Sequence, residues 1–416
     1  PEKVDVPVDF LSGDVAGVNS VYSSAFESRC MALQGKPWDL MSWGFVIQDD
    51  LMGMKSVTQL EQEGAEVLAM GGGFQTYWQQ NHDGSIAPYL FNKMAEIIKF
   101  CQDRKEYCYK GEIVPQIGIL YSTYAWKRIP DGGLYSAHSL EPMKGIMSAL
   151  LDNHLPVEIL MDHHLPGRLE KYPLLVLPEW ENIDPAIHQQ LLDYVKNGGK
   201  LLIVGAKAVV AFKPQLGIKL ADKVHEDTTF YAGLGKNILH LKTDFLPVSL
   251  QDGATSTGVQ LNENDWRFNG KYPLASIQTL GKGKIAAIYM DMGAIYSHHK
   301  NYLVTQLLKT IVQQMQPVLL SEVSGPTNIH QVVSTKNGKL YIHLINTGGP
   351  HDNPNSVVYE SIDALNNIQV KVNLARKPKS IQLQPGNIRL EYSYANGAAS
   401  IRVPKVSVYN IIEIGK

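Results

Sequence analysis

The sequence has 416 residues, more than one compact core usually supports, so two or three domains are expected. Its 38 Lys and Arg nearly balance its 40 Asp and Glu, which gives a formal net charge of −2. This balance argues against a nucleic-acid partner, because recognition of a phosphate backbone needs a concentrated basic face. No apolar run approaches the ~20 residues that cross a bilayer, so no membrane span is expected.

Strands and helices alternate through the first section of the chain, residues 1–112. The order is that of repeated parallel strand–helix units, and three such units fall short of the eight that close a barrel. The opening "VDVPVDFL" predicts a strand and no signal peptide, so sequence upstream of Pro1 is expected to be missing. Strands are predicted at 4–11, 38–45 and 71–78, and helices at 19–34, 56–70 and 89–107.

The second section, residues 113–316, has the pattern of a doubly wound sheet. Apolar runs such as "YPLLVLP" predict buried strands, and helical segments separate them. Ligand sites in such a sheet are expected at the carboxyl ends of its strands. Strands are predicted at 114–122, 156–160, 172–178, 200–206 and 281–291, and helices at 139–155, 185–199 and 301–315.

The third section, residues 317–416, loses the helical period. "HQVVSTKNGKLYIHLINTG" predicts a hairpin that turns at Asn337-Gly338, because this dipeptide favours the tight turns that join antiparallel strands. Five further short strands separated by turn residues follow it. This spacing predicts a β-sandwich.

Carboxylates and aromatic rings gather at the predicted strand ends of the first section. Asp14 ends "FLSGD", Asp39 and Trp43 lie in "PWDLMSWGF", and several rings lie in "GGGFQTYW". Working groups in parallel α/β folds lie where strands end. Glycosidases use a pair of carboxyl groups, one as an acid and one as a base or nucleophile, together with aromatic rings that stack on the sugar. The alternative is that the tryptophans fill space beneath the helices and that the aspartates cap turns.

"KPWDLMSWGF", "GGGF" and "HDGSIAP" together resemble the closing third of the barrel of family 29 α-L-fucosidases. Trp38 and Ser42–Phe45 match the W-E-x-C-x-T…S-W-G-Y strand of that family. Gly72–Phe74 match the following G-G-N strand, and Asp83–Pro88 match the D-G-x-I-x-P turn. One departure concerns the site, because the glutamate that follows the first tryptophan in the family is Asp39 here.

This resemblance implies a retaining glycosidase whose aspartate nucleophile lies on a middle barrel strand. Nothing in residues 1–112 matches that strand, so the nucleophile is expected upstream of Pro1. Asp39 is the first candidate for the acid/base, Asp14 the second, and Glu27 the third, although a helical glutamate is more often a surface charge. The residues expected to contact the sugar are Trp38, Trp43, Phe74, Tyr77 and Trp78.

Residues 115–205 are similar to the middle, trimerisation domain of family 42 β-galactosidases, which has the class I glutamine amidotransferase fold. Amidotransferase chemistry needs a cysteine nucleophile, and residues 109–416 contain no cysteine. The resemblance therefore implies a module that serves assembly or shapes the active site, and a homo-oligomer, either a dimer or a trimer. Family 151 α-L-fucosidases join a related barrel to such a domain, which makes the two resemblances consistent.

Neither a metal nor a cofactor is expected. The adjacent pairs His163-His164 and His298-His299 diverge in direction on a strand or a helix, so one ion rarely takes both side chains. The three cysteines lack metal-ligand spacing. Cys101 and Cys108 either pair in an oxidising compartment or remain separate thiols near a helix end.

The predicted fold is α/β: the C-terminal portion of a (β/α)8 barrel (1–112), an amidotransferase-like doubly wound domain (113–316) and a β-sandwich (317–416). The predicted function is that of a retaining exo-α-L-fucosidase acting on fucosylated oligosaccharides. A β-galactosidase-like glycosidase and a non-catalytic carbohydrate-binding or assembly protein remain as alternatives. The resemblance alone implies a periplasmic or secreted location.

Overall fold

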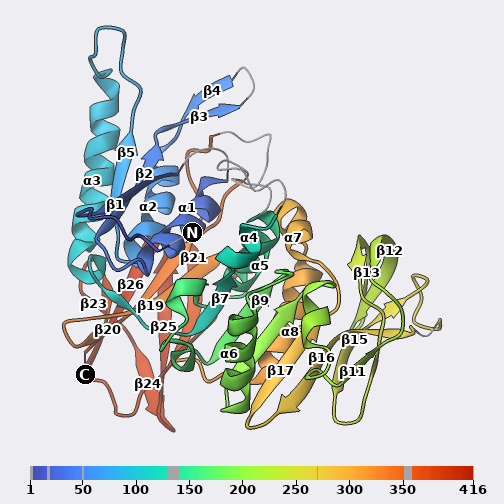
Figure 1. Cartoon of the computed structure of the whole chain (residues 1–416). Helices are drawn as coiled ribbons and strands as arrows, with labels where there is room; N and C mark the ends of the chain where they lie inside the picture. The colour runs from blue at the N-terminus through green and yellow to red at the C-terminus, as the bar shows by residue number, and fades with distance from the viewer. Residues whose placement is uncertain are drawn as a thin grey trace. The chain divides into compact units, whose positions relative to one another are not determined.

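The computed structural model describes residues 3–15, 19–48, 51–129, 140–268, 270–350 and 358–415 (Figure 1). Contacts divide the chain into two compact units. The central unit comprises Pro115–Asn153 and Val157–Val318, and the terminal unit comprises Lys3–Val114, His154–Pro156 and Leu319–Lys416. The predicted first and third sections thus fall in one unit. The division of the chain into three independent domains stays a prediction.

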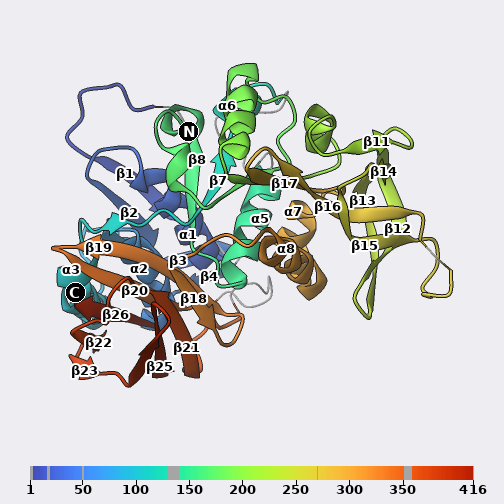
Figure 2. The same cartoon turned by 90° about the horizontal axis from the view of Figure 1, so that it is seen from below.

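The central unit is built on one nine-stranded sheet with the strand order β13-β12-β15-β16-β17-β10-β9-β7-β8. The last five strands of this order are parallel, and the others extend the sheet in antiparallel fashion. Helices α5, α7 and α8 lie on one side of the parallel strands and α6 on the other (Figure 2). Its helices and strands are β7 (Ile117–Tyr121), α4 (Thr123–Trp126), α5 (Glu141–Asp152), β8 (Val157–Met161), β9 (Leu174–Pro178), α6 (Pro185–Lys196), β10 (Lys200–Val204), β11 (Ile218–Leu220), β12 (His225–Leu234), β13 (Asn237–Phe245), β14 (Val248–Leu250), β15 (Thr255–Leu261), β16 (Tyr272–Leu280), β17 (Gly283–Ile288), α7 (Gly293–His299) and α8 (Tyr302–Met315).

The local sequence accounts for these parallel units. Strands β7, β8 and β9 are buried at every position, as expected where helices cover both faces of a sheet. Helix α6 begins with an Asp184 side chain that accepts from the Ala186 N–H, with Pro185 in its first turn. It ends before Gly198, whose φ of +117° suits glycine. The antiparallel strands β11 to β16 were not predicted from the sequence.

The N-terminal part of the terminal unit contains a three-stranded parallel sheet, β1-β2-β5, and a separate hairpin, β3-β4. The predicted strand at 4–11 is wrong, because β1 begins only at Leu11. Pro7 lacks the N–H that a strand needs, and Val6 and Val8 are exposed to solvent. The hairpin was not predicted. The elements are β1 (Leu11–Val15), α1 (Ser20–Ala32), β2 (Trp38–Trp43), β3 (Phe45–Gln48), β4 (Leu51–Met54), α2 (Val57–Ala69), β5 (Gly73–Tyr77) and α3 (Tyr89–Cys108).

The C-terminal part of the terminal unit has two antiparallel sheets, β18-β21-β25-β24 and β23-β22-β26-β20-β19-β6, which share one apolar core. The predicted hairpin is confirmed: β19 pairs with β20 around Asn337 and Gly338, both at positive φ. The α/β class is also confirmed, whereas the barrel, amidotransferase-like and sandwich layouts stay predictions. The strands are β6 (Glu112–Ile113), β18 (Ser321–Ser324), β19 (Ile329–Lys336), β20 (Lys339–Asn346), β21 (Leu365–Asn373), β22 (Ser380–Gln384), β23 (Ile388–Arg389), β24 (Tyr392–Ala395), β25 (Ala398–Val406) and β26 (Tyr409–Gly415).

Helix α2 begins with a capping box whose loss has a predictable cost. The Ser56 hydroxyl accepts from the Gln59 N–H at 3.1 Å, and the Gln59 side chain accepts from the Ser56 N–H at 3.1 Å. Ser56→Ala is expected to lower the free energy of unfolding by about 1 kcal/mol, measured by urea denaturation. The control is Ser393→Ala on exposed β24, which should cost less than about 0.5 kcal/mol. Equal losses in the two variants would contradict a capping role.

Candidate functional site

The sheet β1-β2-β5 has two unlike faces, and the strand register decides which side chains share a face. Along β2, Asp39 and Trp43 alternate with buried residues and lie on the more open face. Asp14 of β1 is in register with Met41, and Tyr77 of β5 is in register with Trp43. Because paired residues of parallel strands project to the same side, Asp14, Asp39, Trp43 and Tyr77 all lie on the open face.

Three of the predicted sugar-contacting rings lie elsewhere, in the hydrophobic cores. Trp38 and Phe74 project from the opposite face of the sheet and pack against the helices. A Cβ on Gly72 would overlap the Trp38 ring, which explains the glycine there. Trp78 is 5% exposed, and its ring occupies the space beside Gly44. Packing accounts for these three rings, and the structure does not bring them together with the carboxylates.

Asp39 is fixed in a cross-strand network toward the amino end of β2. Its two carboxylate oxygens accept from the Ser12 hydroxyl at 2.6 Å and from the Gln75 amide at 2.7 Å. At about 3.3 Å per residue, it lies roughly 13 Å before Trp43 along the strand. Active sites of parallel barrels form at the carboxyl ends of the strands. The position of Asp39 near the amino end of β2 therefore favours a role in holding neighbouring strands together over a role in the reaction.

Asp14, Trp43, Tyr77 and Phe45 form what we call the carboxyl-end cluster. The Trp43 ring lies 5.4 Å from that of Phe45 and 6.4 Å from that of Tyr77, the latter edge to face. Tyr77 is 36% exposed and Asp14 is exposed. From the register, the Asp14 and Trp43 Cα atoms are about 8 Å apart. A carboxylate and aromatic rings therefore share the carboxyl end of the open face.

Glu27, the third predicted carboxylate, is not on this face. It lies on α1, a helix that covers the opposite face of the sheet. There the Met31 side chain approaches Gly13 of β1 from the helix side. Glu27 is half-buried and has a partner of its own. The structure thus separates Glu27 from Asp14 and Asp39.

Buried charges behind the sheet were missed by the sequence analysis. Glu63 of α2 accepts from the Ser20 and Ser42 hydroxyls and pairs with Lys55 at 2.9 Å. Ser42 directly precedes Trp43, so this pair supports the strand that carries the cluster. The Lys55 and Glu63 side chains are both fully buried. The one sign of these buried charges in the sequence is the number of polar residues in α2, and a helix exposed to solvent would show the same pattern.

A second buried ionic group ties α2 to the C-terminal sheets within the same unit. Glu66 pairs with Arg29 at 3.0 Å and with His330 of β19 at 2.5 Å. Burial opposes ionisation of Glu66, yet His330 and Arg29 lower its pKa below the ordinary value. These side chains join elements far apart in sequence, so no local pattern could reveal them.

Within the described residues, no group of three or more His, Cys, Asp or Glu side chains could hold a metal ion. Cys101 and Cys108 both lie on α3 as free thiols, seven residues apart, too far along one helix for a disulfide. No helix of the described chain has both the length and the apolar character to cross a membrane.

Comparison with known proteins shows a likeness in structure alone. No family model and no curated protein matches the sequence. The α-L-fucosidase isoenzyme 2 from Paenibacillus thiaminolyticus superposes on 98% of this chain with a TM-score of 0.82 at 16% identity. A catalytic mutant of the GH42 β-galactosidase Gan42B from G. stearothermophilus gives 0.67 at 13% identity, also over 98%. The cold-adapted β-galactosidase from Rahnella sp. R3 gives 0.65 at 14% identity over 98%.

The chain is shorter than these neighbours. It spans 65% of the fucosidase and 59% and 60% of the two galactosidases. At such low identities the likeness establishes the fold, which this chain shares with glycoside hydrolases.

Proposed function

We propose that this chain is part of a glycoside hydrolase and that the carboxyl-end cluster forms one side of its sugar site. The observation that carries the proposal is the placement of Asp14, Trp43 and Tyr77 at the carboxyl ends of adjacent parallel strands. The fold over 98% of the chain is that of a fucosidase, which supports the same reading.

In this proposal Trp43 and Tyr77 take the apolar C–H face of the sugar, and Asp14 exchanges a proton with the glycosidic oxygen. Asp14 is preferred over Asp39 because it is exposed at the carboxyl end, whereas Ser12 and Gln75 occupy both oxygens of Asp39. A retaining reaction requires a second carboxyl group about 5 Å from the first. We propose that this nucleophile comes from sequence that this chain does not contain.

An α-L-fucoside is the proposed substrate, because the fucosidase gives the higher TM-score. A β-galactoside is the second candidate, favoured by the likeness to the GH42 enzymes. The protein encoded by the full gene should release 4-nitrophenol from the aryl α-L-fucoside faster than from the β-galactoside. Cleavage of neither glycoside would leave a non-catalytic carbohydrate-binding or assembly role.

Substitution of Asp14 tests the assigned role. Asp14→Asn should lower kcat/KM by about 10²–10⁴-fold on a fucosyl disaccharide, whose leaving group needs a proton. The loss should be smaller on the 4-nitrophenyl fucoside, since nitrophenolate leaves without protonation. A merely structural role would lower both rates equally. The matched control is Asp9→Asn, an exposed aspartate that precedes the sheet, and it should leave both rates unchanged.

A further inference from the structure

The parallel sheet of the central unit has a topological switch point between β7 and β9. From β7 the chain passes through α5 to β8 on one side, whereas β9 and then β10 lie on the other side of β7. Connections that leave in opposite directions open a crevice at the carboxyl ends of the two strands. In open α/β sheets, ligands generally bind in that crevice.

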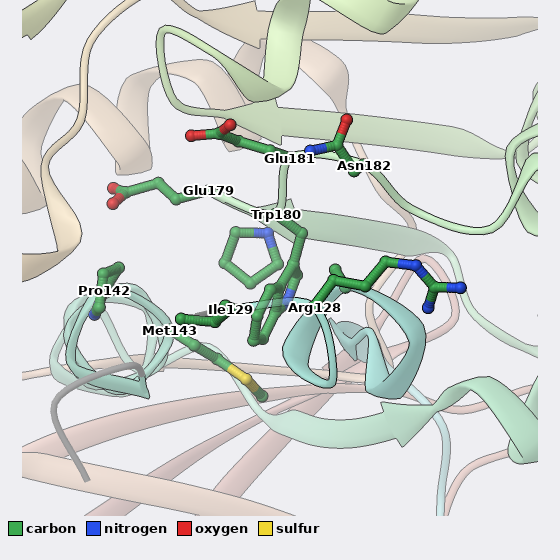
Figure 3. Close-up of a pocket in the computed structure, with 10 residues that line it drawn as sticks. Arg128, Ile129, Pro142, Met143, Glu179, Trp180, Glu181 and Asn182 are labelled. Carbon is green, nitrogen blue, oxygen red and sulfur yellow. The ribbon is translucent and has the colours of Figure 1, made fainter. Parts of the chain in front are cut away.

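A cavity of about 380 Å³ occupies this position, within the range of small-molecule sites. Residues that follow β7, residues that follow β9 and the start of α5 line it (Figure 3). Trp180, Met143 and Ile129 supply apolar surface, as Figure 3 shows. Arg128, Glu181 and Asn182 supply polar groups around it.

The aromatic wall of the cavity is held rigidly. The Trp180 indole N–H donates to the Leu120 carbonyl at 2.8 Å. Its ring stacks on Tyr121, with centroids 5.7 Å apart and planes 9° from parallel. Both partners belong to β7, and Trp180 is 6% exposed. A ring fixed in this way contributes contact area without losing rotamer freedom on binding.

Glu179, which directly follows β9 and lines the cavity, has a strained backbone conformation. Its φ of +51° is in the left-handed region, which costs a non-glycine residue about 1 kcal/mol or more. The conformation lets one carboxyl oxygen accept from the Met292 N–H at 2.8 Å and the Gly293 N–H at 2.7 Å. Such outliers concentrate at functional sites. Burial, followed by the Asp291 charge, raises the Glu179 pKa above its ordinary value, which favours the uncharged carboxyl group.

The charges exposed at the rim of the cavity cancel. Arg128 carries one positive charge and Glu181 one negative charge, and both are exposed at the rim. A guanidinium, a carboxylate and the Asn182 amide beside one aromatic wall match a neutral ligand rich in hydroxyl groups. We propose that this cavity binds one neutral sugar residue. The site belongs to the central unit and is additional to the carboxyl-end cluster of the terminal unit.

Fluorine NMR of the chain labelled with 5-fluorotryptophan tests this directly. The sequence has six tryptophans, and Trp180→Phe and Trp43→Phe assign the two resonances of interest. Titration with L-fucose or D-galactose should shift the Trp180 resonance. In the double variant Glu181→Gln/Asn182→Ala, the dissociation constant obtained from this titration should rise about tenfold or more, because two hydrogen bonds to the sugar are lost. The matched control, Glu170→Gln, changes another exposed glutamate of the same unit and should leave the response unchanged.

The same spectra separate this site from the proposed catalytic one. A sugar that shifts Trp43 but not Trp180 would overturn the second site and leave the proposed function standing. A Trp180 shift with no change at Trp43 would support the second site on its own. If the double variant responds like the parent protein, or if sodium acetate shifts Trp180 at lower concentration than either sugar, the assignment to a neutral sugar is wrong.

Discussion

Lys55→Met is expected to lower the free energy of unfolding of the terminal unit by about 3–5 kcal/mol, because the substitution leaves Glu63 as an unpaired buried charge. In the parent protein, Lys55 lies 2.9 Å from a Glu63 oxygen, and both side chains have no exposed surface. The Ser20 and Ser42 hydroxyls remain as donors to Glu63, but neutral donors offset only part of the lost charge. Urea denaturation followed by circular dichroism gives the difference.

A double-mutant cycle distinguishes loss of the pair from loss of packing. Glu63→Gln combined with Lys55→Met should be less destabilised than Lys55→Met alone, because no unpaired charge remains. The control pair is Lys99 and Asp103 on α3, which lie 2.7 Å apart with side chains 74% and 40% exposed. Lys99→Met should cost at most about 1 kcal/mol. If Lys55→Met costs no more than Lys99→Met, the buried pair contributes little to stability.

The regular elements were largely predictable because each follows from a local pattern. The buried strand β9 follows from an unbroken apolar run, and the hairpin between β19 and β20 follows from Asn337-Gly338. The strand predicted at 4–11 failed because alternation of valine with polar residues does not reveal whether a partner strand exists. Whether a segment joins a sheet depends on residues remote from it in sequence.

The candidate site was predicted less well, although part of it was accessible from the sequence. Trp38 and Trp43 are five residues apart on one strand, and an odd spacing sends them to opposite faces. Phe74 and Tyr77 differ in the same way on β5. The period of two therefore separates core rings from open-face rings, but it does not say which face the helices cover.

Other features of the site required the tertiary structure. The two hydrogen bonds that fix Asp39 come from β1 and β5, so its carboxylate looked free when only β2 was considered. The cavity in the central unit depends on the order of strands in the sheet. The sequence indicates that β7 and β9 exist, but it does not show that they are neighbours. Switch-point sites are thus hidden until the topology is known.

Glu179→Gln is expected to remove a pH dependence of the stability of the central unit. Burial, followed by the Asp291 and Asp244 charges, raises the Glu179 pKa from 4.5 to about 8, although the Met292 and Gly293 N–H groups act in the opposite direction. The Asp291 pKa is raised to about 6 for similar reasons. Between pH 4.5 and 8 the unfolded chain loses a proton that the folded chain keeps. Stability therefore falls as the pH rises through this window.

Glutamine at position 179 keeps the oxygen that accepts from Met292 and Gly293 but does not ionise. The variant should match the parent near pH 5 and exceed it at pH 8, with a difference on the order of 2–4 kcal/mol in the free energy of unfolding. Urea denaturation at several pH values measures it, and Glu170→Gln serves as the control. Titrating groups remote from Glu179, such as His343 of the terminal unit, whose pKa burial lowers, cancel in the comparison. A parent and a variant whose stabilities change in parallel would show that Glu179 is already ionised at pH 5, so that the cavity carries a net negative charge instead of none.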